Sequence, residues 1–200
     1  MTIAAIVLAA GGSRRLGQPK QLLRLEGETL VERAIRLAGE AGARPVLAIL
    51  GAQGERIRRE VDFERLGNRY GAAAVMHAEW EEGVGSSIHA AMERLGELAP
   101  DARGVLILGC DQPRLTAEHL RAMMDEFERQ PAAAMVASTY AGIEGIPAIF
   151  PAEAFEELRA LGGDRGARSV LKGGKWPLIG VAFAGGEVDI DTPTDLKKLK

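Results

Sequence analysis

The sequence predicts an α/β fold of the Rossmann-like, three-layer type, in which a mostly parallel sheet lies between helices. Its apolar runs are nearly unbroken, as expected of parallel strands that are covered on both faces. These runs alternate with amphipathic segments of helical spacing. The first run ends in a glycine-rich loop at residues 11–17, and proteins of this class bind ligands beyond the carboxyl ends of their strands.

In the first half of the chain we expect strands at residues 3–9, 45–50, 72–77 and 104–108, where apolar residues follow one another. Helices are expected between them at residues 29–41, 55–60 and 86–95. Thr29 and Glu32 have the spacing of a capping box, which predicts the start of the first helix. Ile88, Met92 and Leu95 share one face of the third helix.

In the second half we expect helices at residues 117–129, 152–161 and 194–200 and strands at 135–140, 146–150 and 178–183. Residues 142–145 and 161–166 are the most loop-like interior stretches. No repeat or linker interrupts the pattern, and the length suits one domain over residues 1–200.

Composition excludes several classes of protein. The net charge of −3 argues against a nucleic-acid-binding face, and the single cysteine, Cys110, allows neither a disulfide framework nor a zinc cluster. The apolar run at residues 2–10 has no basic start, and it is too short to span a bilayer. We therefore expect a cytoplasmic enzyme without a membrane partner.

The glycine-rich loop matches neither of two common phosphate-binding motifs. Gly12 and Gly17 have the spacing of a P-loop, but Gln18 and Pro19 stand where that motif needs a lysine and a hydroxyl residue. The dinucleotide fingerprint fails because Ser13 replaces its second glycine. Backbone N–H groups beside arginine and lysine still suit phosphate oxygens, so the loop indicates a nucleotide. The alternative is a glycine turn with exposed cations.

Two acidic segments could hold a metal ion. Asp111 follows the strand expected at residues 104–108, where a carboxylate can hold Mg²⁺ over bound phosphates. A turn aspartate that accepts local backbone N–H groups would explain Asp111 equally well. Near the C-terminus, helix capping accounts for residues 192–195 but not for Asp189 and Asp191. On an extended segment these two carboxylates point the same way and repel each other unless a cation or donor intervenes.

Residues 83–87 combine glycines and serines at the expected start of a helix. Such a turn presents backbone N–H groups and hydroxyls to an anionic ligand. The simpler explanation is that Ser86 caps the helix while Gly83 and Gly85 form the turn.

The glycine-rich loop resembles the opening motif L-A-A-G-x-S-x-R-M-G-x-x-K of the nucleotidyltransferases that activate molybdopterin. The matching residues are Leu8, Ala9, Ala10, Gly11, Ser13, Arg15, Gly17 and Lys20. Leu16 replaces the methionine of the motif. Leu-Ala-Ala-Gly is similar to the molybdenum cofactor cytidylyltransferases, the MocA-like members of the MobA-like NTP transferase family, whereas guanylyltransferase relatives usually have Leu-Ala-Gly-Gly.

Further segments resemble the same family in the same order along the chain. Residues 83–88 resemble its G-x-x-S-S-L segment, with Ile88 in place of leucine, and Cys110 to Pro113 resembles C-D-x-P. Residues 145–150 resemble its G-x-P-x-x-F strand, and residues 163–168 its G-D-x-G-A-R loop. Residues 189–196 resemble its D-x-D-T-P-x-D-L ending.

The resemblance implies a fold of the nucleotide-diphospho-sugar transferase type and a Mg²⁺ site at Asp111 and Asp191, with Asp189 the weaker candidate. The implied catalytic residues are Arg15, Lys20 and Asp111. The implied nucleotide-binding residues are Leu8, Ala9, Ala10, Gly11, Gly12, Ser13, Arg15, Lys20, Gly85, Ser86, Ser87 and Asp111. The implied acceptor-binding residues are Gly145, Pro147, Asp164, Gly166 and Arg168. Residues 163–168 form the glycine and arginine loop, and an arginine that makes only a surface salt bridge is the alternative explanation of this loop.

The expected reaction is transfer of CMP from CTP to the terminal phosphate of molybdopterin, the molybdenum cofactor, with release of pyrophosphate. The first half of the chain would bind the nucleotide and the second half the acceptor, and a recipient molybdoenzyme is a further possible partner. Three alternatives stay open: a guanylyltransferase that uses GTP, a sugar- or alcohol-phosphate nucleotidyltransferase, and a non-catalytic cofactor carrier. The paired carboxylates and cations argue against the carrier.

Overall fold

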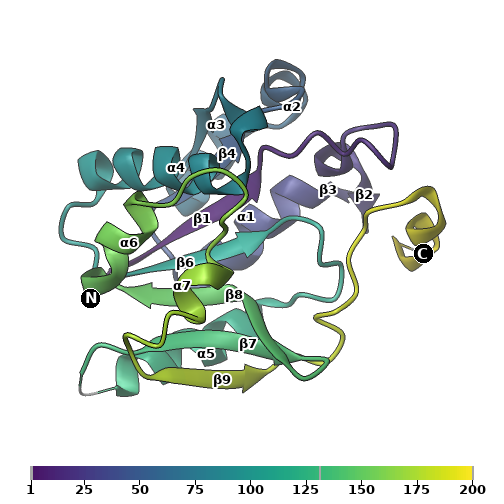
Figure 1. Ribbon diagram of the computed structural model, residues 1–200. Helices are drawn as coiled ribbons and strands as arrows, with labels where there is room; N and C mark the ends of the chain where they lie inside the picture. The colour runs from purple at the N-terminus through teal and green to yellow at the C-terminus, as the bar shows by residue number, and fades with distance from the viewer. Residues whose placement is uncertain (1, 131, 200) are drawn as a thin grey trace.

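A seven-stranded sheet forms the centre of the computed structural model, which describes residues 2–130 and 132–199 (Figure 1). Its strand order is β5-β4-β1-β6-β8-β7-β9. The strands are β1 (Ile3–Ala9), β4 (Val46–Leu50), β5 (Ala72–Met76), β6 (Gly104–Gly109), β7 (Met135–Tyr140), β8 (Ile143–Pro151) and β9 (Leu178–Ala182). Only β8 runs antiparallel to its neighbours in this sheet. The predicted α/β fold with a mostly parallel sheet is therefore confirmed.

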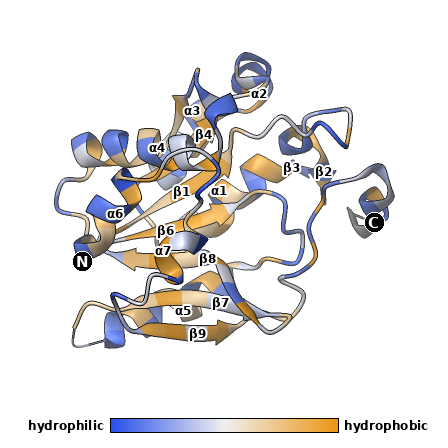
Figure 2. Ribbon diagram, viewed as in Figure 1, coloured by the Kyte–Doolittle hydropathy of each residue, from blue (hydrophilic) through white to orange (hydrophobic). Residues whose placement is uncertain are grey.

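Helices cover both faces of the sheet, and the alternation of side chains along β1 supplies both cores. Ala5 and Val7 face the core beneath α1 (Leu30–Ala41), α3 (Phe63–Tyr70) and α5 (Ala117–Arg129). Ala4 and Ile6 face the core beneath α4 (Val84–Leu98), α6 (Phe155–Arg159) and α7 (Arg168–Leu171). The hydrophobic strands between more polar helices are evident in Figure 2. The nearly unbroken apolar run of β1 follows from this burial on two faces.

Shorter elements connect these layers. Helix α2 (Gly54–Glu60) buries Ile57 in the first core. A two-stranded ribbon pairs β2 (Arg24–Leu25) with β3 (Glu28–Thr29). The 3-10 turns are η1 (Lys20–Leu22), η2 (Trp80–Glu82), η3 (Ala152–Ala154) and η4 (Pro193–Leu199).

Capping signals in the sequence identify helix starts correctly where the cap is local. The Thr29 hydroxyl accepts from the Glu32 amide, and the Glu32 carboxylate accepts from the Thr29 amide, as the capping box predicts. Thr116 caps α5 in the same way through the His119 amide. Asp62 caps α3, a helix missing from the sequence-based prediction although Leu66 and Tyr70 form its buried side.

Several predicted boundaries are wrong. Helix α4 begins at Val84, before the predicted residue 86, and Ser86 is not its cap. Residues 143–145, predicted as loop, belong to β8, because the turn to β7 occupies only Ala141 and Gly142, whose φ angles are 48° and 74°. The region predicted as a helix at 152–161 divides into η3 and α6, and α7 was not predicted. The predicted closing helix is the 3-10 turn η4, and its expected last residue, Lys200, lies outside the described residues.

Within residues 2–130 and 132–199, no helix combines the length and the apolar character that crossing a bilayer requires.

Candidate active site

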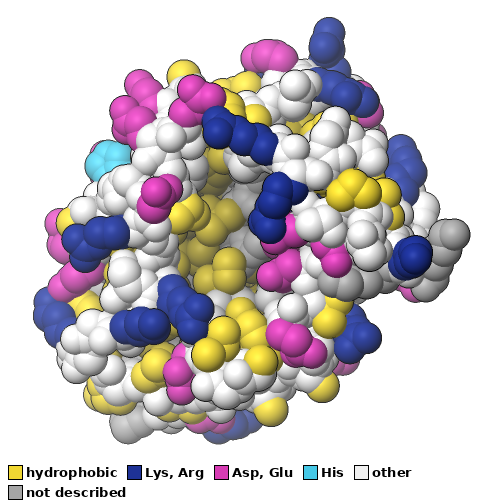
Figure 3. Space-filling model, turned by 45° about the vertical axis from the view of Figure 1, so that its right-hand side comes forward, with side chains coloured by type: hydrophobic (Ala, Val, Ile, Leu, Met, Phe, Trp, Pro, Cys, Tyr) yellow, Lys and Arg dark blue, Asp and Glu magenta, His cyan; other side chains and the backbone are white. Residues whose placement is uncertain are grey.

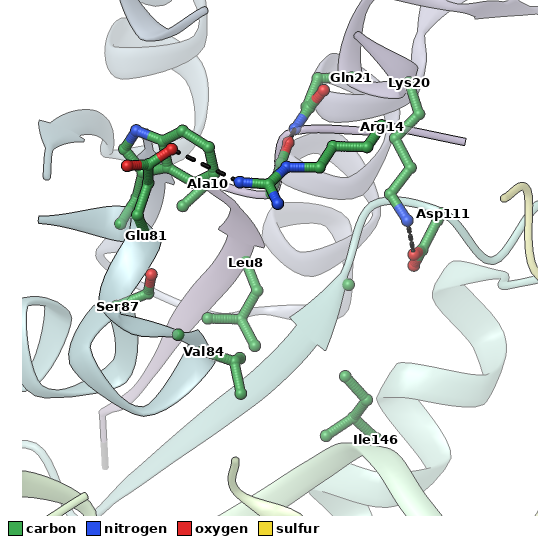
Figure 4. A pocket seen from close by; sticks show the side chains of 14 residues that line it. Leu8, Ala10, Arg14, Lys20, Gln21, Glu81, Val84, Ser87, Asp111 and Ile146 are labelled. Atoms are coloured by element: carbon green, nitrogen blue, oxygen red, sulfur yellow. Dashed lines mark hydrogen bonds and ion pairs between the residues drawn. The ribbon is translucent and has the colours of Figure 1, made fainter. Parts of the chain in front are cut away.

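A cavity of about 460 Å³ opens at the edge of the sheet where β1 and β6 end. Because β8 is antiparallel to β6, its amino end lies at the same edge and contributes Ile146. The space-filling view shows a hollow with an apolar floor and charged side chains around its rim (Figure 3). Its lining residues are Leu8, Ala10, Gly11, Arg14, Lys20, Gln21, Trp80, Glu81, Gly83, Val84, Ser87, Gly109, Asp111 and Ile146 (Figure 4). The volume lies in the range of small-molecule sites.

The glycine-rich loop is held in shape by its own polar contacts. Ser13 adopts a left-handed conformation, with φ 49°, and its carbonyl accepts from the Leu16 amide at 3.0 Å. The Ser13 hydroxyl accepts from the Lys20 amide at 3.0 Å. The Gln21 side-chain amide donates to the carbonyls of Ala9 and Gly11, both at 2.8 Å. These hydrogen bonds of Ser13 and Gln21 therefore fix the conformation of the loop and position Lys20 at the cavity.

Two carboxylates from distant parts of the chain meet at the Lys20 ammonium. Lys20 Nζ donates to Asp111 Oδ2 at 2.5 Å and to Asp191 Oδ1 at 3.0 Å. Arg15 Nη2 donates to the second oxygen of Asp191 at 3.0 Å. The side chains of Lys20, Asp111 and Asp191 are 17%, 25% and 37% exposed, whereas Arg15 is 71% exposed. The predicted convergence of Asp111, Asp191, Lys20 and Arg15 is present.

The local backbone explains why these carboxylates lie here. A Cβ at Gly109 would lie 2.5 Å from Asp111 Oδ1, so glycine leaves room for this side-chain direction. The Ile190 amide donates to the Asp111 carbonyl at 3.0 Å, which brings the C-terminal segment beside β6. The Asp195 carboxylate then accepts from the amides of Asp191 and Thr192. The Thr192 hydroxyl donates to the same carboxylate, and the Asp195 amide donates to the Thr192 backbone carbonyl, so only the carboxylate half of the predicted capping arrangement is present. The Asp191 side chain is directed at Lys20.

The surroundings shift the ionisation of these groups. Burial by itself lowers the pKa of Lys20, but the charge and hydrogen bond of Asp111, together with the hydrogen bond to Asp191, raise it above its ordinary value. Burial raises the pKa of Asp191, but the contacts with Lys20 and Arg15 outweigh it, so the net pKa is lowered. Lys20 and Asp191 are consequently both charged at neutral pH.

The neighbouring Cys110 takes no part in this charge network. Burial raises the pKa of its thiol to about 12. The thiol is therefore protonated at neutral pH, and Cys110 is a small buried group.

The carboxylates suit Mg²⁺ only if a ligand completes its coordination. Among the described residues, no group of three or more His, Cys, Asp or Glu side chains is placed to hold a metal ion. Mg²⁺ commonly binds through one or two carboxylates together with substrate phosphates and water. Asp111 and Asp191 match the carboxylate part of that donor set, beside the glycine-rich loop.

Part of the predicted nucleotide-binding set lines the cavity, namely Leu8, Ala10, Gly11, Lys20, Ser87 and Asp111. The others lie around it. The Ala9 side chain lies in the core on the opposite face of β1, and Gly12 packs beneath Trp80, whose ring would lie 3.2 Å from a Cβ at this position. Ser13 and Arg15 lie outside the lining and are hydrogen-bonded to Lys20 and to Asp191, respectively.

Gly85 and Ser86 have structural roles that the sequence did not reveal. The Gly85 amide donates to the Gly163 carbonyl at 2.8 Å, so a distant loop satisfies the first turn of α4. Ser86 is buried; its hydroxyl donates to the Gly83 carbonyl at 2.8 Å and lies 2.9 Å from His77 Nε2.

The predicted acceptor-binding residues lie outside the cavity lining. Gly145 leaves space for the Tyr140 hydroxyl, and buried Pro147 accepts through its carbonyl from Ser138. Gly166 packs beside Val84, while Asp164 and Arg168 are exposed. The apolar wall on this side of the cavity consists instead of Val84 and Ile146 (Figure 4).

The predicted site residues do not include Arg14, Gln21, Trp80, Glu81, Gly83, Val84, Gly109 and Ile146, which line the cavity. The turn at residues 83–87 was nevertheless expected to face a ligand, so Gly83 lies in a segment that the sequence had indicated. Arg14 and Glu81 approach each other at the cavity with a Nη2–Oε1 distance of 3.5 Å (Figure 4). The available signals were the position of Arg14 within the cationic loop and that of Gln21 directly after Lys20.

A phosphate-type loop, a lysine and two carboxylates at the carboxyl edge of a mostly parallel sheet define a nucleotidyltransferase. Comparison with known families agrees, because residues 5–178 match the MobA-like NTP transferase domain. The chain belongs to the MobA-like NTP transferase family.

Two relatives illustrate the range of this similarity. Purine catabolism protein PucB of Bacillus subtilis is 30% identical over 96% of this chain and 93% of its own length. A probable molybdenum cofactor guanylyltransferase of Synechococcus elongatus is 32% identical over 76% of this chain and 75% of its own length.

Solved structures have the same architecture. The crystal structure of Rv0371c from Mycobacterium tuberculosis has a TM-score of 0.80 and 29% identity, covering 100% of this chain and 98% of that one. A manganese complex of Rv0371c has a TM-score of 0.76 and 26% identity, with the same coverage.

Proposed function

We propose that the protein transfers CMP from CTP to the terminal phosphate of the molybdenum cofactor. The observation that carries this proposal is the cluster of Lys20, Asp111 and Asp191 at the cavity beside the glycine-rich loop. These groups suit a reaction between two phosphates, since charge on phosphate oxygens is what such a site must neutralise.

The proposed reaction is a direct displacement. A terminal phosphate oxygen of the acceptor forms a bond to the α-phosphorus of CTP, and the bond from that phosphorus to the oxygen of the β-phosphate breaks. Pyrophosphate leaves with the electron pair. The backbone of residues 8–13 would cradle the triphosphate, while Arg15 and Lys20 would stabilise the charge on the departing pyrophosphate.

Mg²⁺ is the cofactor we propose, with Asp111 and Asp191 as its protein ligands. When bound, it would neutralise phosphate charge and favour the leaving group. The manganese complex of Rv0371c is consistent with divalent-metal binding in a related fold. Asp189 is exposed, and we assign it no ligand role.

The choice of CTP over GTP rests on Ala10. Its methyl group lines the cavity, and its carbonyl accepts from the Ala52 amide at 3.0 Å, which holds this segment in place. A methyl group here takes space that glycine would leave open, and a pyrimidine needs less space than a purine. Because a relative carries the name of a guanylyltransferase, GTP is the second candidate.

For the acceptor, we propose that the pterin lies against the apolar wall of Val84 and Ile146. Arg168, from the glycine and arginine loop, is the proposed cation for its phosphate, with Gly145, Pro147, Asp164 and Gly166 shaping that side. The product would then pass to a recipient molybdoenzyme.

The deciding experiment incubates the protein and Mg²⁺ with molybdenum cofactor and each of CTP, GTP, ATP and UTP, with pyrophosphate release as the readout. We expect release with CTP and cofactor together. Preference for GTP would identify a guanylyltransferase, and turnover only with a sugar or alcohol phosphate would identify a different acceptor. Cofactor binding without any nucleotide turnover would contradict the enzyme assignment and favour a carrier.

A further inference from the structure

The Lys20 ammonium occupies the space between the two carboxylates proposed as metal ligands. Its Nζ lies 2.5 Å from Asp111 Oδ2 and 3.0 Å from Asp191 Oδ1. A divalent cation that binds both carboxylates needs this same space, because metal–oxygen bonds to Mg²⁺ are about 2.1 Å long. The ammonium and the metal ion therefore compete.

The charges of the cluster lead to the same conclusion. Lys20 and Arg15 carry two positive charges, and Asp111 and Asp191 carry two negative charges, so the cluster is neutral without a ligand. A neutral cluster attracts a divalent cation only weakly. A triphosphate changes this balance because it adds negative charge and offers oxygens to the Lys20 ammonium.

The Lys20 ammonium can move from the two carboxylates to the oxygens of a bound triphosphate. Its backbone is anchored, since the Lys20 amide donates to the Ser13 hydroxyl and Gln21 is bonded to the loop. Its side chain is a flexible four-carbon stem that lines the same cavity as Gly11 and Asp111. The ammonium can therefore turn toward phosphate oxygens without moving the loop.

We propose that Lys20 keeps divalent cations out of the nucleotide-free site and admits them only with a nucleoside triphosphate, so that the metal–nucleotide complex is the ligand that binds. This inference rests on the proposed metal site at Asp111 and Asp191. It does not depend on which base or acceptor the enzyme uses.

The test measures the electron paramagnetic resonance signal of free Mn²⁺ in the presence of the protein alone, with CTP and with GTP. The loss of signal caused by the same nucleotide without protein is subtracted, because a triphosphate binds Mn²⁺ by itself. The wild-type protein should bind Mn²⁺ weakly alone and more tightly with CTP. Lys20→Met should bind Mn²⁺ alone about tenfold more tightly than wild type, because two carboxylates then lack their internal cation. Lys20→Gln repeats the test with a polar neutral side chain in case the first variant does not fold.

Arg14→Met is the matched control, because Arg14 lines the same cavity but pairs with Glu81 instead of the two aspartates. Its Mn²⁺ affinity should equal that of wild type. Unchanged or weaker Mn²⁺ binding by both Lys20 variants would overturn the proposed competition. If no form of the protein binds Mn²⁺, even with CTP, the proposed metal site is wrong. If GTP increases Mn²⁺ binding and CTP does not, the competition with Lys20 still holds and only the proposed base is contradicted.

Discussion

The side of the cavity that we propose binds the nucleotide and the side that we propose binds the acceptor are built in different ways. On the proposed nucleotide side, Gly11 lies just after β1, Lys20 follows at the end of the same loop, and Asp111 lies just after β6. On the acceptor side, Val84 and Ile146 come from a helix start and from an antiparallel strand. The first side consists of short motifs behind parallel strands, whereas the second depends on how distant segments pack.

This difference explains which site residues the sequence located. Phosphate recognition needs backbone N–H groups and fixed charges within a few residues, which leaves a recognisable motif. The acceptor wall needs only apolar side chains of suitable shape, which resemble ordinary core residues. Gly145 and Pro147, which the motif indicated, belong to β8 but do not line the cavity. The residue between them, Ile146, does line it.

Among the variants that test this comparison, Asp111→Asn should cause the largest loss of activity. Loss of one carboxylate from the proposed metal site should lower kcat for CTP-dependent pyrophosphate release by more than about 10³-fold. Asp101→Asn, on an exposed turn, is the control and should turn over normally. Near-normal turnover of the Asp111 variant would remove its metal role.

Lys20→Ala should have the next largest effect, a loss of about 10²–10³-fold in kcat, because one fixed cation no longer stabilises the leaving group. Steady-state rates at saturating CTP measure this loss. Arg15→Ala should lose less than Lys20→Ala, since Arg15 is 71% exposed and its charge is screened by water. The opposite order would assign the main leaving-group contact to Arg15.

Arg168→Ala tests the acceptor side. If this exposed arginine holds the acceptor phosphate, the KM for molybdenum cofactor should rise about tenfold while the KM for CTP stays unchanged. Steady-state titrations of each substrate separate the two constants. An equal rise in both values would show that the two sides are not independent.

The smallest effect should be on stability as a function of pH. The folded-state pKa of Asp191 is lowered, so its stabilising contribution is present above the pKa of an unfolded aspartate and is lost as pH falls through the folded value. Lys20 has a raised pKa, so its contribution is present below the ordinary lysine value and is lost at higher pH. The Tm difference between wild type and Asp191→Asn should therefore be constant near neutral pH and shrink in acid. A difference that grows in acid would contradict the ion pair.

Local chemistry explains how much of the fold could be predicted. The strands of both cores carry apolar runs and α5 carries a helical pattern, so side-chain pattern located them, while the capping box at Thr29 located the start of α1. The predicted start of α4, residue 86, lies after its actual start at Val84. The reason is that the Gly85 amide in the first turn donates to the Gly163 carbonyl, which is far away in the chain. A hydrogen-bond acceptor so far away in the chain cannot be predicted from the residues next to the helix start.

Local sequence carried the strand and helix pattern, the phosphate-type loop and the acidic residues at Asp111 and Asp191. Their meeting at one ammonium group required the sheet, because parallel strands end at one edge and the Ile190 amide ties the C-terminal segment to Asp111. The apolar wall of Val84 and Ile146, proposed to bind the acceptor, was likewise set by the reversed direction of β8 and the packing of α4. Short-range hydrogen bonding and side-chain periodicity are recorded in consecutive residues, whereas contacts across many residues depend on packing that no short segment specifies.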